Sequence, residues 1–285
     1  MLKRIIHIIR STPHAIHMYM YRQRKPWIAQ GKYGLYYRII PNSALEYHIV
    51  QFGIFNDWIA IHLSDLLSKD SVVLDIGANV GLLTLPFSKQ VPQGKIYAFE
   101  PDNVARESLE ENIRLNKLIN VIVFPFALQD DVARKSITFY KRETKDADGL
   151  TNKGLSSIEA IEKFTIETVR VPATTVDAII SNQKINHIDF IKIDVEGAEV
   201  KVLKGARNTI KKYMPIILYE YSTTIDILAS SHNSEESFLF LKQLGYKQYE
   251  IVNERKFRLL KQPEVIFGSN ILCFPSNKIP NIVKS

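Results

Sequence analysis

Two predicted strands carry a glycine turn and an acid that together could hold a nucleoside. The apolar strand Val72–Ile76 runs into the turn Gly77-Ala78-Asn79-Val80-Gly81. The next apolar strand, Lys95–Phe99, ends in Glu100, 19 residues after Gly81. Glycines allow a ligand to approach the backbone, and an acid about 20 residues further on can accept hydrogen bonds from two ribose hydroxyls. This layout predicts a site for a nucleoside-bearing cofactor.

The residues of the turn restrict the kind of cofactor. A dinucleotide site needs the middle glycine of G-x-G-x-x-G and a helix that points at a pyrophosphate. Here Asn79 stands in the middle of the turn, and no Lys or Arg lies between Asp75 and Lys89. An uncharged turn beside Asp75 favours a cationic ligand without phosphate. S-adenosylmethionine has a sulfonium, an amino acid end and an adenosine, and it fits this description better than NAD.

Further acids lie at or near the ends of later predicted strands. Asp194 and Glu196 follow the strand Ile188–Ile193, and Glu220 lies near the end of the strand Ile216–Tyr221. In an open parallel sheet, ligands bind outside the carboxyl ends of the strands. These acids should therefore face the same opening as the glycine turn. Acids two residues apart could supply a general base or half of a Mg²⁺ site.

Each acid also has a structural alternative. Asp194 could cap the following helix, Asp75 could cap the glycine turn, and Glu100 could be an ordinary acid at the end of a strand. Lys192 shares the two-residue period of Asp194, so it could pair with a neighbouring carboxylate. These alternatives remain open at the level of sequence.

The elements that must position these residues alternate between strand and helix from residue 71 onward. Such alternation predicts an α/β fold with a mostly parallel sheet that helices cover on both faces, and the last strand pair is expected to be antiparallel. Pro86 falls inside one predicted helix, where an interior proline costs about 3 kcal/mol, so we expect a kink or a short helix there. The predicted helices are 46–69, Val80–Lys89, Asn103–Lys117 and Glu235–Leu244, together with one that begins near Thr175 and one that ends near Lys211; Asn103 is the expected N-cap of its helix. The other predicted strands are Val121–Phe126, Ser136–Tyr140, Thr168–Val171, Lys247–Val252 and Asn270–Phe274.

The stretch from Asp130 to Gln183 interrupts this alternation. It holds two predicted strands, a polar segment over 141–152 and the run Gly154-Leu155-Ser156-Ser157. One interpretation is an excursion at the edge of the sheet with a solvated loop. The other is a substrate lid, since long loops at such positions often carry binding residues.

The charge of the chain is concentrated near its N-terminus. The net charge is +7, yet eight Lys or Arg and no acid precede Glu46, which leaves 29 bases against 30 acids in the rest. We therefore expect a basic N-terminal extension over 1–45, helical in its first 25 residues, and a folded domain over 46–285. The extension could dock onto the domain, or contact an anionic membrane surface or a partner.

Other sequence features bear on location. The apolar stretch Ile5–Ile9 is too short for a signal peptide, and no run of about 18 apolar residues could span a bilayer. The lone Cys273 excludes an internal disulfide framework and a cysteine zinc cluster, and it suits a reducing compartment. We expect Cys273 to lie in the core and the protein to be cytoplasmic.

Three motifs together resemble the FkbM family of S-adenosylmethionine-dependent methyltransferases. They are the turn Asp75–Gly81, the strand end Phe99-Glu100-Pro101 and the block Lys192–Glu199, which reads Lys-Ile-Asp-Val-Glu-Gly-Ala-Glu. The last block is the most specific, because the glycine turn is shared by most methyltransferases of this fold. The resemblance covers about residues 55–275. It implies that the domain over 46–285 is an S-adenosylmethionine-dependent methyltransferase domain with a Rossmann-like α/β fold of the class I methyltransferase type.

The resemblance implies methyl transfer to a hydroxyl of a sugar, glycan or small natural product. It places the methionine end of the cofactor at the turn from Asp75 to Gly81, including Gly77, Ala78 and Asn79, the ribose at Glu100 beside Pro101, and the adenine near Asn103 and Ala127. The base that takes the hydroxyl proton would be Asp194 first, Glu196 second and Glu220 third. No metal ligand set follows from the resemblance, and Mg²⁺ remains an additional possibility.

Three rival functions remain. A nucleic-acid methyltransferase could use the basic extension as a tether, but the remainder of the chain is not basic. A module that binds S-adenosylmethionine without catalysis could recruit other enzymes through the extension. A nicotinamide-dependent oxidoreductase is disfavoured by the missing middle glycine and by the antiparallel pair expected at the end of the sheet.

Overall fold

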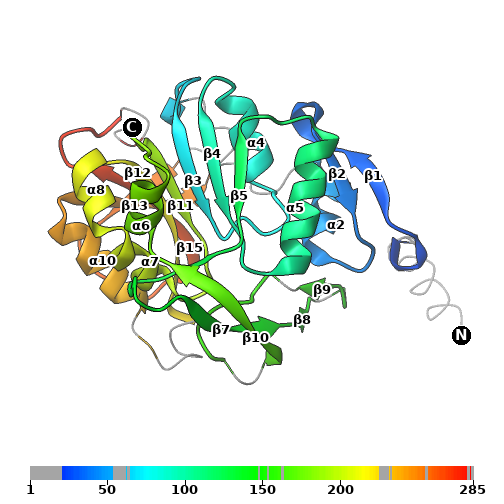
Figure 1. Cartoon of the computed structure of the whole chain (residues 1–285). Coiled ribbons are helices and arrows are strands. Elements are labelled where there is room, and N and C mark those ends of the chain that lie inside the picture. Colours follow the sequence, from blue (N-terminus) through cyan, green and yellow to red (C-terminus); the bar gives the residue numbers. More distant parts are fainter. Residues whose placement is uncertain are drawn as a thin grey trace, which may run out of the picture.

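The computed structural model describes residues 21–53, 62, 65–146, 148–152, 154–161, 164–224, 231, 233–253, 256–280 and 283. Most of the helix predicted over residues 1–25, and residues 54–61 of the helix predicted over 46–69, lie outside these ranges. The described part contains an eight-stranded sheet with helices on both faces (Figure 1). The strands are β1 (Trp27–Gln30), β2 (Tyr36–Ile39), β3 (Val72–Ile76), β4 (Lys95–Phe99), β5 (Val121–Phe124), β6 (Ala127–Leu128), β7 (Ser136–Arg142), β8 (Thr144–Lys145), β9 (Thr151–Asn152), β10 (Thr165–Thr174), β11 (Phe190–Ile193), β12 (Ile216–Ser222), β13 (Tyr246–Asn253), β14 (Lys256–Leu260) and β15 (Phe267–Pro275). The helices are η1 (Lys32–Gly34, a 3-10 turn), α2 (Ala44–Phe52), α4 (Thr84–Gln90), α5 (Asn103–Leu115), α6 (Val176–Asn182), α7 (Glu199–Gly205), α8 (Arg207–Tyr213) and α10 (Asn233–Gln243).

The main sheet has the order β14-β13-β15-β12-β11-β3-β4-β5. Strands β12, β11, β3, β4 and β5 pair in parallel, and β15 pairs antiparallel with both β12 and β13. The predicted parallel sheet with an antiparallel C-terminal strand is confirmed. From β3 the chain proceeds outward to β4 and β5, and it later returns to the other side of β3 as β11. The strand order therefore reverses between β3 and β11, the place where open α/β sheets bind ligands.

The side chains of β3 alternate between two apolar layers. Val72, Leu74 and Ile76 pack in the layer that contains buried residues of α6, α7, α8 and α10. Val73 points to the opposite layer, where Phe87 of α4 is fully buried. A strand that is apolar on both faces is expected in a parallel sheet that helices cover on both sides.

Three helix boundaries differ from the sequence prediction. Helix α2 ends at Phe52 because Gly53 adopts a left-handed conformation with φ 76°, so the predicted helix over 46–69 is not continuous. Helix α4 begins four residues later than predicted and is short, which places Pro86 in its first turn, where a proline is tolerated. Asp102, not Asn103, is the N-cap of α5, and its carboxylate accepts hydrogen bonds from the backbone amides of Val104 and Ala105.

The stretch from residue 130 to 183 forms a separate small sheet. β7 and β10 pair antiparallel and β6 joins β10 in parallel, and these strands lie below the main sheet in Figure 1. The loop that follows β9 is connected to this sheet, because the amide of Tyr140 donates a hydrogen bond of 2.8 Å to the carbonyl of Ser157. The same loop reaches the cavity described below.

Strands β1 and β2 form a hairpin beside α5 (Figure 1), which the sequence did not predict. Two asparagines of α5 hold β2: the side-chain oxygen of Asn112 accepts from the amide of Arg38 at 2.8 Å, and that of Asn116 accepts from the amide of Tyr36 at 2.8 Å. The buried side chain of Tyr37 belongs to an apolar cluster with residues of α4 and α5.

Two further expectations from the sequence concern membrane-spanning helices and Cys273. Within the described residues, none of the helices combines the length and the apolar character that crossing a membrane requires. Cys273 is fully buried and unpaired in β15, as predicted for a core residue.

Candidate active site

A cavity of about 400 Å³ opens beyond the ends of β3 and β11, where the strand order reverses. This volume lies in the range typical of sites for small ligands and cofactors, roughly 300–1,000 Å³. Its lining comes from the glycine turn, from the ends of four parallel strands and from segments on either side of them in sequence. The lining residues used below are Ile40, Ser43, Leu45, Glu46, Gly77, Ala78, Asn79, Glu100, Pro101, Asp102, Val104, Ala105, Phe126, Ala127, Asn152, Gly154, Ser156, Ser157, Lys192, Asp194, Glu196, Glu220 and Asn270.

The turn after β3 is held in a left-handed conformation. Gly77 has φ 78°, Asn79 has φ 49° and Gly81 has φ 91°. The amides of Gly77 and Ala78 both donate to the carbonyl oxygen of Phe99 at 3.0 Å, which ties the turn to the end of β4. Gly77, Ala78 and Asn79 line the cavity and Gly81 does not.

Glu100 is buried at the end of β4 and joins the glycine turn to the start of α5. One carboxylate oxygen accepts from the amide of Asn79 and the other from the amide of Asp102, each at 2.8 Å. Burial raises the pKa of Glu100 to about 7, although these two hydrogen bonds act in the opposite direction. Each oxygen retains a second acceptor site, so Glu100 can still accept from a bound ligand.

Asp75 does not line the cavity. Its carboxylate is fully buried, accepts a hydrogen bond of 2.6 Å from the Thr84 hydroxyl and lies 3.4 Å from the ammonium of Lys192. The sequence placed the methionine end of the cofactor at Asp75, but this acid supports the floor of the cavity from below. The predicted pairing of Lys192 with neighbouring acids is confirmed, because its ammonium also lies 3.4 Å from Asp194.

Lys192 also fixes the turn directly. Its ammonium donates to the carbonyl oxygen of Gly77 at 2.7 Å. Burial disfavours the charged amine, but the carboxylates of Asp194 and Asp75 outweigh that penalty, and the pKa of Lys192 is raised. Lys192 therefore remains a cation between the glycine turn and the acids.

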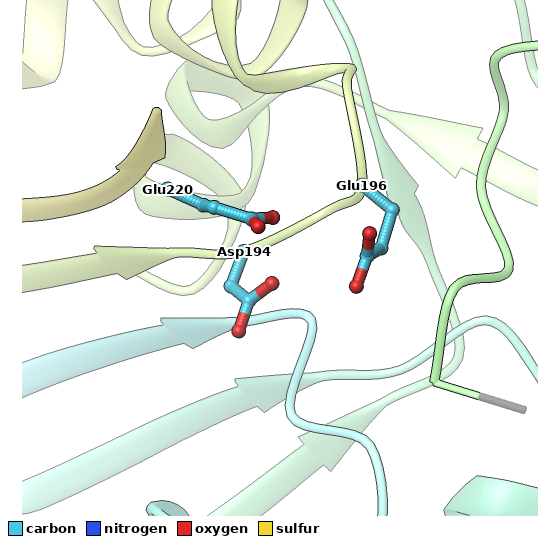
Figure 2. Close-up of side chains that lie close together, drawn as sticks. All are labelled: Asp194, Glu196 and Glu220. Carbon is cyan, nitrogen blue, oxygen red and sulfur yellow. The ribbon is translucent and has the colours of Figure 1, made fainter. Parts of the chain in front are cut away.

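Asp194, Glu196 and Glu220 converge on one part of the cavity (Figure 2). One carboxylate oxygen from each lies within 4.8 Å of the others. Burial raises the pKa of Glu196 and of Glu220 well above the ordinary value, and the carboxylate of Asp194 adds to the shift in both. Oxygen Oε2 of Glu220 is buried and has no hydrogen-bond partner among the described residues.

The loop that carries two of these acids is shaped by Glu199. The carboxylate of Glu199 accepts from the amides of Val195 at 3.0 Å and Gly197 at 3.1 Å. Asp194 does not cap α7, because that helix begins after Ala198 without a side-chain cap. The loop leaves Glu196 at φ 57°, a conformation uncommon for a residue with a side chain.

Among the cofactor-binding residues expected from the sequence, Pro101 and Ala127 line the cavity. Asn103, like Gly81 and Asp75, does not. The side chain of Asn103 instead accepts a hydrogen bond of 3.3 Å from Lys141. Its neighbours Asp102, Val104 and Ala105 face the cavity.

Sequence reasoning missed one wall of the cavity. Ser43 and Glu46 line it from the N-terminal side, and the 4% exposed Glu46 accepts a hydrogen bond from the Ser43 hydroxyl. This wall is tied to β9, since Thr151 of that strand donates from its amide to the carbonyl of Asn42 at 2.8 Å. The spacing of Ser43 and Glu46, three residues apart as in a capping box, is the sequence signal that could have indicated this wall.

The loop that follows β9 supplies a further wall. Asn152, Gly154, Ser156 and Ser157 line the cavity, and the Ser157 hydroxyl donates to the carbonyl of Val195 at 2.7 Å. The stretch from 130 to 183 is thus both an additional sheet and a contributor to the cavity.

A comparison with known families identifies this arrangement. The model of the methyltransferase FkbM domain matches residues 75–248. The chain belongs to the FkbM methyltransferase family. The matched FkbM region contains the glycine turn, Glu100 and all three clustered acids, whereas the cavity-lining Glu46 and Asn270 lie outside it.

Similar proteins include members of this family. AMB antimetabolite synthetase AmbE of Pseudomonas aeruginosa is 30% identical over 195 residues, which are 59% of this chain and 9% of AmbE. The 31-O-demethyl-FK506 methyltransferase FkbM of Streptomyces tacrolimicus is 27% identical over 195 residues, covering 59% of this chain and 75% of that enzyme. The chain thus spans only a small part of the length of AmbE. The crystal structure of methyltransferase FkbM from Methylobacillus flagellatus has a TM-score of 0.46 and 14% identity, and covers 94% of this chain and 60% of that one.

Proposed function

We propose that this protein transfers a methyl group from S-adenosylmethionine to a hydroxyl of a small molecule, sugar or glycan. The observation that carries the proposal is the position of Asp194, Glu196 and Glu220, whose oxygens lie within 4.8 Å of one another in the same cavity as the glycine turn and Glu100. Membership of the FkbM family and the relative that is named as an O-demethyl-FK506 methyltransferase support transfer to oxygen.

The residues around the turn fit S-adenosylmethionine. The backbone of Gly77–Asn79 lines the cavity together with acids that could stabilise a cation. Among the described residues, Lys192 is the one Lys or Arg that lines the cavity. Glu100 can accept from the ribose hydroxyls with its free lone pairs. Apolar Phe126 and Ala127 can cover the adenine.

When bound, the cofactor supplies a methyl group on a positively charged sulfur, which is already electrophilic. The chain has to align the acceptor oxygen, exclude water and remove the hydroxyl proton. Asp194 is the first candidate for the base, because it lines the cavity at the end of β11 and its side chain is 38% exposed, so a bound acceptor can reach it. Glu196 and Glu220, whose pKa values are raised, can hold the acceptor by hydrogen bonds and are the second and third candidates.

The same three carboxylates are of the ligand type that Mg²⁺ prefers. If Mg²⁺ bound there, Asp194, Glu196 and Glu220 would hold it, and it would supply Lewis-acid chemistry that lowers the pKa of the acceptor hydroxyl. Lys192, which already pairs with Asp194, supplies one positive charge to this region without a metal.

The direct test is transfer of labelled methyl from S-adenosylmethionine to a panel of hydroxyl compounds, each assayed with Mg²⁺ and with EDTA. The panel holds neutral and anionic sugars, nucleotide sugars and short glycans, together with RNA and DNA. We expect label in at least one small hydroxyl compound and none in nucleic acid. If none of the small compounds of either charge is labelled while the cofactor binds, the proposed function is wrong.

A further inference from the structure

The ionisable side chains that line the cavity are almost all acidic. Among the described residues that line it, Lys192 is the single basic one. Six acids line the same cavity: Glu46, Glu100, Asp102, Asp194, Glu196 and Glu220. Two of them, Glu46 and Glu100, are 4% and 6% exposed, so solvent screens their charge poorly.

The one amine in the wall is already fully engaged. A lysine ammonium has three donors, and Lys192 has three partners: the carbonyl of Gly77 at 2.7 Å, Asp75 at 3.4 Å and Asp194 at 3.4 Å. It could neutralise an incoming anion only by giving up one of these partners. Asp75 would then be left as a buried charge without a counter-ion, which is costly.

Three basic residues near the cavity, among those described, have partners of their own and are not part of the lining, although the charge of Arg142 acts on Glu196. Arg142 donates to the carbonyls of Leu155 and Glu159, and Arg106 donates to the carbonyls of Glu100 and Pro101. Lys141 pairs with Asp102 at 3.1 Å, and neither it nor the two arginines is part of the lining.

The acidic lining affects the ionisation of its own carboxyl groups. The pKa values of Glu196 and Glu220 are raised by burial and then by the neighbouring carboxylates. A site that already resists ionisation of its own carboxyl groups resists an added negative charge for the same reason. It favours a cationic cofactor and groups that donate hydrogen bonds.

We propose that the acceptor is an uncharged compound with adjacent hydroxyls, and that the cavity rejects acceptors with a carboxylate or phosphate beside the hydroxyl to be methylated. Two neighbouring hydroxyls can donate to two of the three converging carboxyl groups, one while it reacts and the other to fix orientation. Among the described residues, the single basic side chain of the cavity lining, Lys192, is already engaged and does not meet an anionic group without losing a partner. This inference rests on the proposed function and names the substrate class of the same site. It also disfavours the phosphate-rich backbone of nucleic acid.

The test compares matched acceptors in the labelled-methyl assay. Methyl glycosides of neutral hexoses are paired with the glycosides of the corresponding hexuronic acids and with the hexose 6-phosphates. We expect kcat/KM to be at least 100-fold higher for the neutral member of a pair. Equal or faster labelling of the anionic member overturns this inference and leaves the proposed methyl transfer intact. No labelling of either kind overturns both.

Glu46 offers a variant outside the converging acids. At pH 8.5, above its pKa of about 7, the variant Glu46→Gln removes one negative charge from the wall. We expect the preference for the neutral acceptor to fall on the order of tenfold, as one buried charge nearby predicts. The matched control Glu236→Gln changes an exposed acid that pairs with Lys204 and should leave the preference unchanged. An unchanged preference in well-folded Glu46→Gln would count against a role of wall charge in selectivity.

Discussion

Gly77 lies directly against the main-chain carbonyl of Asp194. A Cβ atom at Gly77 would be 1.8 Å from the carbonyl oxygen of Asp194 and 2.9 Å from its carbonyl carbon. The proposed cofactor turn after β3 and the acid loop after β11 are therefore in backbone contact at the point where the strand order reverses. The position of the proposed methyl donor and that of the proposed base are set by one contact that admits no side chain.

The first prediction concerns this contact. Gly77→Ala should abolish binding of S-adenosylhomocysteine in calorimetry, because the added methyl must displace either the turn or the acid loop, and because φ 78° is strained for alanine. Gly245→Ala is the matched control, since Gly245 has a similar φ of 85° with open space around it. That variant should lose only about 1 kcal/mol of stability and keep full binding. Equal effects of the two variants would show that the close approach has no role.

The second prediction concerns Lys192. Lys192→Met removes the counter-ion of the buried Asp75 and one donor to Gly77, so the free energy of unfolding should fall by about 3–5 kcal/mol in urea denaturation. Lys204→Met breaks an exposed pair with Glu236 and should cost less than about 1 kcal/mol. Adding Asp75→Asn to Lys192→Met should restore part of the loss. Similar losses for the two lysine variants would contradict the assigned role.

The third prediction separates the candidate bases. Asp194→Asn should reduce kcat by roughly 10²–10⁴-fold, the usual contribution of a general base, with little change in S-adenosylhomocysteine affinity. Glu196→Gln and Glu220→Gln should act more on KM for the acceptor, since a neutral amide can still make hydrogen bonds. If Asp194→Asn and Glu196→Gln both retain wild-type turnover with normal cofactor binding, neither residue is the base.

The fourth prediction concerns pH and the buried Glu46. Burial raises the pKa of Glu46 to about 7 from an ordinary value of 4.5, so the folded state binds the proton more tightly than the unfolded state. Its stabilising contribution is full below pH 4.5 and is lost as pH rises through about 7, with a slope of up to about 1.4 kcal/mol per pH unit. Unfolding free energies measured from pH 5 to 8 should fall less steeply in Glu46→Gln than in the wild type. Parallel curves would refute this contribution.

The mostly parallel sheet and the acids at its edge could be predicted from the sequence, although the order of the strands was not. Strands such as Val72–Ile76 are apolar on both faces and are followed by a glycine turn, and both signals are local. The carboxyl ends of parallel strands share one edge, so Asp194 and Glu196 could be assigned to the mouth that also holds Glu100. Their convergence with Glu220 follows from the adjacency of β11 and β12.

Other features depend on contacts between distant parts of the chain. Asp75 was expected beside the ligand, but the position of Lys192 in the adjacent strand and the Thr84 hydroxyl satisfy it below the cavity floor. The shift of the N-cap from Asn103 to Asp102 is a choice between two adjacent residues that both make good caps. The hairpin before residue 40 depends on asparagines of α5 more than 70 positions away, for which the sequence offers no periodic signal.

That hairpin leads into the one wall of the cavity that comes from the N-terminal part of the chain. Asn112 and Asn116 bind main-chain atoms of β2, so these hydrogen bonds do not depend on which side chains the hairpin carries, whereas the 2.8 Å ion pair of Arg38 with Glu111 does. The segment from Ile40 to Glu46 then contributes its side chains to the cavity wall. Exchanging this N-terminal segment between family members would thus replace one wall of the cavity and leave the glycine turn and Glu100 in place. Exchange of this segment would therefore change substrate preference without changing the proposed cofactor site.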